Sequence, residues 1–127
     1  MVTTDISQLS SECNTCRQQL RSHRDEFTHL THELQHAAAG QTSKDLLKNV
    51  ERYYNQFQIQ LGNIHDLKQA IKSHDRKISG VAPLGSASET LYARHEELYD
   101  QCQNLDHHLQ ELKHDFHHFM EKVAVTT

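Results

Sequence analysis

The sequence predicts an all-α protein, an elongated antiparallel three-helix bundle with left-handed coiled-coil packing. Apolar residues recur at alternating steps of three and four along three long segments, a spacing that is typical of coiled coils. The 127 residues include only one proline and four glycines, too few for the many turns of a β-sandwich or a barrel. The length fits a single domain, which we assign to residues 1–127.

Two short turn-rich stretches divide the chain into its three segments. Residues that typically end or cap a helix occur in both stretches and near the start of the chain. They are Asp5, Gln8, Gly40, Thr42, Ser43, Gly80, Pro83, Ser86 and Glu89. The predicted helices therefore span about 5–39, 43–79 and 87–125.

Each segment carries an unbroken three-four spacing of mostly apolar positions, which predicts the seam that faces the other helices. The seam positions are Ile6, Leu9, Cys13, Cys16, Leu20, His23, Phe27, Leu30, Leu34, Ala37, Leu47, Val50, Tyr54, Phe57, Leu61, Ile64, Lys68, Ile71, Asp75, Ile78, Leu91, His95, Leu98, Cys102, Leu105, Leu109, Leu112, Phe116, Phe119 and Val123. A strict seven-residue repeat of this kind implies left-handed supercoiling.

Further apolar residues lie beside the seam of the second and third segments. These six flanking residues are Leu46, Tyr53, Leu67, Tyr92, Tyr99 and Met120. A two-stranded coil does not need so wide an apolar face, whereas a core of three helices does. Because the connections are short, consecutive helices are expected to run antiparallel. The predicted architecture is similar to that of spectrin-type repeats, although no spectrin sequence motif is present.

Polar residues interrupt the predicted seam at His23, Lys68, Asp75 and His95. The short connections place Asp75 opposite His95. We predict either a buried ion pair between these two side chains that fixes the helix register, or two hydrated side chains near the open end of the bundle.

The three cysteines allow three interpretations. Buried free thiols that act as small hydrophobic residues are expected in a reducing compartment. Zinc binding by Cys13, Cys16, Cys102 and His95 would form a Cys₃His site. A redox dithiol at Cys13 and Cys16 is the third interpretation, although the strand–helix setting of such dithiols is absent. The same helix alignment places Cys16, Lys68 and Cys102 in one layer of the bundle.

Histidines form a stripe on the outer face of the first segment and another on the third. The candidate metal ligands in these stripes are His29, His32, His36, His107, Glu111, His114 and His118. Histidines four residues apart on a helix are spaced to chelate Zn, Ni or Cu. The alternatives are a solvated face, because two imidazoles supply only part of a typical zinc site, or a pH-sensing face.

Composition and motifs exclude several functions. Seventeen acidic and 13 basic residues give a net charge of −4, without the basic patch that nucleic-acid binding requires. There is no apolar run long enough to span a membrane and no secretory signal, which predicts a cytoplasmic location. No glycine-rich phosphate loop or nucleophile motif is present. We therefore expect a protein that is not an enzyme.

The sequence predicts a non-enzymatic protein that acts through protein–protein interaction or self-association. Its partner would be another protein or a second copy of the chain, contacted through the six flanking residues, and no cofactor is required. The alternative is a metal-binding or metal-buffering protein that uses the histidine stripes for Zn, Ni or Cu.

Overall fold

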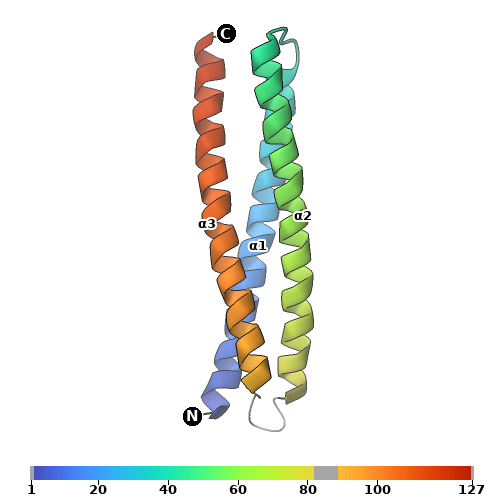
Figure 1. Ribbon diagram of the computed structural model, residues 1–127, viewed down its shortest axis with the longest axis vertical. Coiled ribbons are helices and arrows are strands. Elements are labelled where there is room, and N and C mark those ends of the chain that lie inside the picture. The colour runs from blue at the N-terminus through green and yellow to red at the C-terminus, as the bar shows by residue number, and fades with distance from the viewer. Residues whose placement is uncertain (1, 82–88, 127) are drawn as a thin grey trace.

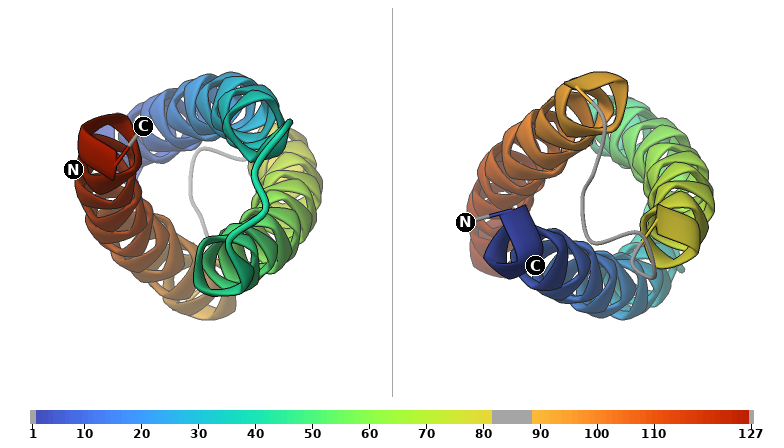
Figure 2. Two further views of the ribbon diagram at one scale, coloured as in Figure 1. Left: turned by 90° about the horizontal axis from the view of Figure 1, so that it is seen from above. Right: turned by 90° about the horizontal axis from the view of Figure 1, so that it is seen from below.

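The computed structural model describes residues 2–81 and 89–126. Within them the chain forms three helices: α1 (Val2–Ala38), α2 (Lys44–Val81) and α3 (Glu89–Thr126). The helices run up, down and up along one long axis (Figure 1). Seen along that axis they occupy the corners of a triangle (Figure 2), so that each helix lies beside the other two. The predicted all-α, three-helix bundle is confirmed.

The connection between α1 and α2 has the predicted capping residues. Gly40 adopts a φ of 79°, the left-handed conformation that commonly follows the end of a helix. Ser43 directly precedes α2, and its Oγ accepts a hydrogen bond from the backbone N–H of Leu46 at 3.3 Å. Ser43 is therefore the N-cap of α2.

Two predicted helix ends are wrong. α1 begins at Val2 and includes Asp5, because no proline or glycine interrupts the helix before that residue. α2 continues through Gly80 to Val81. A glycine inside a helix costs only about 1 kcal/mol relative to alanine, and the buried side chain of Ile78 holds this last turn against the core. Pro83 and Ser86, and with them the predicted capping box, lie outside the described residues.

The predicted seam matches the structure on α1 and α3, where its side chains are buried or half-buried. On α2 the predicted seam consists of two columns of residues spaced seven apart, and one of these columns is wrong. The predicted positions Tyr54, Leu61, Lys68 and Asp75 are half-buried, and Leu47 is exposed. The buried positions, each one residue earlier, are Tyr53, Gln60, Leu67 and His74. With Leu46 added before Tyr53, each column contains three apolar residues, but burying the charges of Lys68 and Asp75 would cost more than burying an amide and a neutral imidazole.

An aromatic cluster joins all three helices in the half of the bundle that contains the α1–α2 connection. Phe27, Phe57 and Phe116 are fully buried. The ring of Phe57 lies 5.4 Å from that of Phe27 and 5.0 Å from that of Phe116, in edge-to-face geometry. The hydroxyl of Tyr53 donates a hydrogen bond to the backbone carbonyl of Asp115 at 3.2 Å. The cluster therefore fixes α2 against both neighbouring helices.

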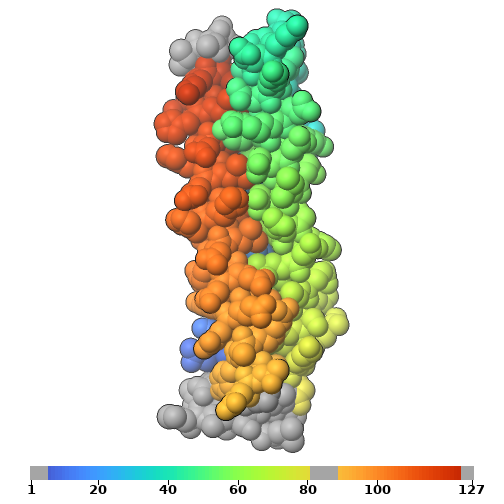
Figure 3. Space-filling model, in the orientation of Figure 1, coloured from blue at the N-terminus to red at the C-terminus, as the bar shows by residue number. Residues whose placement is uncertain are grey.

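The surface of the bundle is that of a long rod. Figure 3 shows the side chains of α2 and α3 meeting along most of its length. Among the described residues, no helix combines the length and the apolar character needed to cross a membrane.

Candidate metal centre

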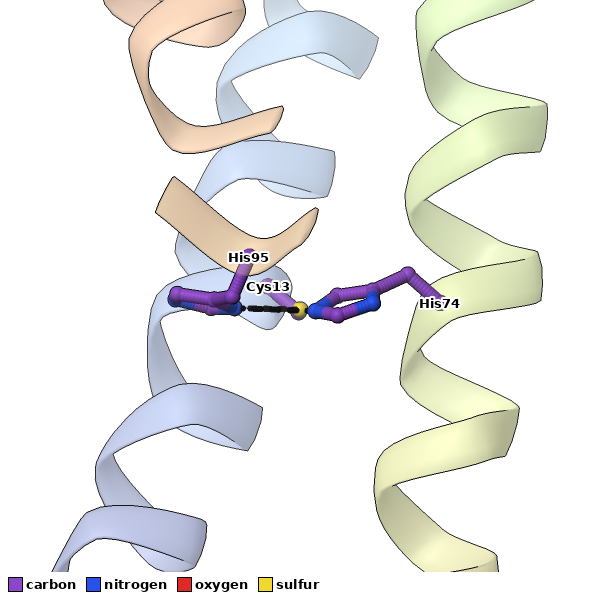
Figure 4. Close-up of side chains that lie close together, drawn as sticks. All are labelled: Cys13, His74 and His95. Atoms are coloured by element: carbon purple, nitrogen blue, oxygen red, sulfur yellow. Dashed lines mark hydrogen bonds between the residues drawn. The ribbon is translucent and has the colours of Figure 1, made fainter. Parts of the chain in front are cut away.

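One side chain from each helix converges in the core of the other half of the bundle: Cys13 of α1, His74 of α2 and His95 of α3. Figure 4 shows the three pointing toward one another. The Nδ1 atom of His95 lies 3.9 Å from the sulfur of Cys13 and 3.1 Å from Nε2 of His74. All three residues are at most 5% exposed. Within the described part of the chain, this is the one group of three metal-ligating side chains whose ligand atoms all lie within 4.8 Å of one another.

The orientation of α2 decides which of its side chains enters this site. His74 points into the core and reaches His95, while Asp75 points toward α1. The carboxylate of Asp75 accepts a hydrogen bond from Ser10 at 3.3 Å and lies 3.8 Å from the guanidinium of Arg17. The predicted ion pair between Asp75 and His95 is therefore wrong, although the predicted burial of His95 is confirmed.

A carboxylate at the edge of the site orients the imidazole of His95. The Nε2 atom of His95 lies 2.9 Å from Oε1 of Glu12. Because a carboxylate only accepts hydrogen bonds, Nε2–H of His95 donates to it, and in the tautomer with this single N–H the Nδ1 lone pair faces the interior. Nε2–H of His74 then donates to that Nδ1. The Nδ1 atom of His74 is buried and has no hydrogen-bond partner among the described residues.

Burial keeps the other two side chains uncharged at neutral pH. Burial, together with the nearby carboxylate of Asp75, raises the pKa of Cys13 to about 11, although the charge of Arg17 acts in the opposite direction. Burial also lowers the pKa of His74, and the neighbouring His95 adds to this effect. At neutral pH the site therefore presents a thiol and a neutral His74 imidazole, and a cation must displace the thiol proton to bind a thiolate.

The other two cysteines form a disulfide that links α1 to α3. Cys16 and Cys102 are bonded, with their Cα atoms 6.4 Å apart, and Cys13 is a buried free thiol. The predicted layer that places Cys16 beside Cys102 is confirmed. Three free thiols, the Cys₃His zinc site and the Cys13–Cys16 dithiol are all contradicted, because the sulfurs of Cys16 and Cys102 are bonded to each other and only Cys13 is free.

This arrangement makes a direct prediction about thiol chemistry. Alkylation of the urea-unfolded protein should label one cysteine, Cys13, before reduction and all three after reduction. Intact mass spectrometry counts the labels. A Cys13→Ala variant is the matched control and should carry no label before reduction. Three labels on the unreduced protein would show that Cys16 and Cys102 are not bonded.

The histidine stripes lie on the solvent-exposed faces of α1 and α3, as their spacing predicts. His29 contacts Glu33 at 3.1 Å, and His107 contacts Glu111 at 3.0 Å. The rings of His114 and His118 are 5.0 Å apart. His32 and His36 are exposed as well. No stripe residue belongs to the group of three ligands found within the described part of the chain.

The six flanking residues have different environments. Tyr53 and Leu67 are buried in the core. Leu46, Tyr92 and Met120 are half-buried and pack against it. Tyr99 is 38% exposed. Widening of the core therefore accounts for the positions of Tyr53 and Leu67.

The heptad analysis selected Cys13 and His95 but missed His74. The signal that identifies His74 is its column on α2, which it shares with Tyr53 and Leu67 and which competes with the column of Asp75 for the core.

Family models, curated proteins and solved structures were compared with this chain, and none of them matches it.

Proposed function

We propose that this protein binds a transition-metal ion in the core of its bundle, with Cys13, His74 and His95 as ligands. The observation that carries the proposal is the convergence of these three buried side chains from three helices. Thiolate and imidazole together are the donors that zinc prefers, and imidazole also suits copper and nickel.

The distances between the ligand atoms fit such an ion. With Zn–S of about 2.3 Å and Zn–N of about 2.0–2.1 Å, tetrahedral geometry separates two nitrogens by about 3.4 Å and sulfur from nitrogen by about 3.6 Å. The corresponding separations are 3.1 Å between His74 and His95 and 3.9 Å between Cys13 and His95. Each of these separations differs from its tetrahedral value by about 0.3 Å, and the third pair, Cys13 and His74, lies within 4.8 Å.

Glu12 supports the proposal from outside the ligand set. Histidine ligands usually donate their other ring N–H to a carboxylate or a carbonyl, which orients the ring and makes it a stronger donor. The 2.9 Å contact between Glu12 and His95 has this form. A divalent ion bound to one thiolate and two neutral imidazoles keeps one positive charge, and the nearby carboxylate of Glu12 is placed to offset it.

The other functions expected from the sequence stay predictions. Self-association or binding of another protein would use the flanking residues that remain accessible, of which Tyr99 is the most exposed of those described. Metal binding or pH sensing by the surface stripes would be independent of the core site. A cytoplasmic location and the lack of enzymatic activity also stay predictions, and the disulfide between Cys16 and Cys102 weighs against a reducing compartment.

A zinc titration tests the proposal. Untagged protein, stripped of metal by a chelator, should bind one zinc ion and unfold at a higher urea concentration when zinc is present. A ligand at 100 times its Kd stabilises the folded state by about 2.7 kcal/mol, less any binding to the unfolded chain. The measurements are calorimetric stoichiometry, urea unfolding with and without zinc, and molar mass.

Two variants distinguish the core site from the surface stripes. The stabilisation by zinc should be lost in Cys13→Ala, and circular dichroism checks that this variant folds without metal. The matched control, His114→Ala with His118→Ala, removes two exposed imidazoles and should keep the whole effect. The reverse pattern, loss in the stripe variant and retention in Cys13→Ala, would overturn the proposal in favour of the stripes.

A further inference from the structure

The proposed metal site supplies three ligands, one fewer than a tetrahedral ion takes. Cys16 and Asp75, two other potential donors in this half of the bundle, are already engaged. The sulfur of Cys16 is bonded to Cys102. Asp75 accepts from Ser10 and lies beside Arg17. These contacts keep the sulfur and the carboxylate from completing the ligand set.

Glu12 is also placed outside the ligand set. Its carboxylate contacts Nε2 of His95 at 2.9 Å, whereas Nδ1 of the same ring faces Cys13 and His74. These two nitrogens lie on different sides of the imidazole. To bind the same ion, the carboxylate of Glu12 would have to give up its hydrogen bond to His95.

A small cavity adjoins Cys13 and His95, two of the three proposed ligand residues. It has a volume of about 20 Å³, and its lining includes Cys13, His95, Ile71, Leu98 and Tyr99. About 10–15 Å³ is enough to hold one water molecule where a polar partner binds it, and because the exposed lining of this cavity is apolar, that partner would have to be the metal ion. The cavity therefore has room for one ligand atom beside the metal position, but not for a further protein side chain.

An open groove lies beside this cavity. The groove has a volume of about 440 Å³ and lies between α1 and α3. Glu12, His95 and Tyr99 line both the groove and the cavity. The partly exposed ring of Tyr99 therefore borders both the groove and the cavity, and a small ligand would have to pass it on the way from one to the other.

We propose that the metal bound by Cys13, His74 and His95 keeps one coordination position open to the small cavity and binds an exogenous ligand there. The inference rests on the proposed function. The ligand is water or hydroxide, or a small linear anion such as azide that binds through one end and extends toward the groove. Three protein ligands and one exchangeable ligand are the arrangement of reactive metal sites, whereas closed structural sites have four protein ligands.

Cobalt in place of zinc makes it possible to follow two events by absorption: binding of the metal by Cys13, and binding of an exogenous ligand to that metal. Co²⁺ bound to the wild-type protein should give a thiolate-to-cobalt charge-transfer band in the near ultraviolet and d–d bands in the visible region. Addition of azide should shift the d–d bands saturably, with isosbestic points, while the charge-transfer band remains. The second observation reports an exchangeable ligand on a cobalt ion that still has its cysteine.

A filled cavity provides the matched variant. Leu98→Phe places a larger side chain in the cavity and should keep the charge-transfer band while losing the azide response. If that variant fails to fold, Ile71→Phe fills the same cavity from α2. Retention of the full azide response in a folded, cobalt-binding variant of this kind would overturn the assignment of the open position to the cavity.

The outcomes separate this inference from the proposed function. A charge-transfer band without any azide response in the wild-type protein overturns the inference and leaves the proposed function standing. An azide response that appears only in Glu12→Gln also overturns it, because Glu12 is then the fourth ligand. Absence of the charge-transfer band contradicts the proposed function itself.

Discussion

Replacement of Phe57 by alanine should lower the free energy of unfolding by about 3–5 kcal/mol. Phe57 is fully buried, and its ring contacts the rings of Phe27, Phe116 and Tyr53, so that all three helices meet around it. Alanine removes these contacts and leaves a cavity that the stiff, packed helices fill only in part. Urea unfolding followed by far-ultraviolet circular dichroism measures the change.

Ile59→Ala is the matched control for this substitution. Ile59 lies two residues from Phe57 on the same helix and is 56% exposed. Its replacement should change the free energy of unfolding by no more than about 0.5 kcal/mol, since little buried surface is lost and alanine has the higher helix propensity. Equal effects of the two substitutions would contradict the placement of Phe57 in the core.

The affinity for zinc should rise about tenfold for each pH unit between about pH 6.5 and about pH 8.5. Burial raises the pKa of Cys13 to about 11, so the thiol is protonated throughout this range and each bound ion releases one proton from it. Raising the pH removes a competitor of the metal. Burial lowers the pKa of His74 from 6.5, and His74 therefore adds little to the slope above pH 6.5.

Competition with a chelator of known affinity, corrected for the chelator's own protonation, gives the zinc affinity at each pH. In Cys13→Ala the affinity should be much lower and its dependence on pH much weaker. The double variant His114→Ala with His118→Ala should keep the slope of the wild-type protein. A flat profile for the wild-type protein would exclude the Cys13 thiolate as a ligand.

Much of the fold could be predicted from the sequence because its signals are local and repeated. The heptad spacing identifies side chains that are buried or half-buried in the structure, from Ile6 to Ala37 on α1 and from Leu91 to Val123 on α3. Gly40 and Ser43 mark the connection between α1 and α2 through short-range conformational preferences. Over about 37 residues, a regular apolar stripe leaves each of these two helices a single favourable face.

The candidate site could be predicted only in part. Cys13 and His95 occupy seam positions of α1 and α3, the two helices whose apolar pattern allows a single assignment of the buried face. Both residues are buried, as that assignment predicts. The disulfide between Cys16 and Cys102 could not be assigned, although the two residues were placed in one layer. Sequence spacing determines which layers meet, but the distance and direction of the two sulfurs depend on how the helices pack.

The sequence by itself determined three helices, their order and the seams of α1 and α3, whereas the tertiary structure decided the rotation of α2. Two neighbouring columns on α2 have equal numbers of apolar residues, and a local pattern cannot choose between them. Packing against two other helices makes the choice, because Lys68 and Asp75 keep their charges near solvent when the column of His74 turns inward. That rotation brings His74 to Cys13 and His95 and thereby completes the candidate metal centre.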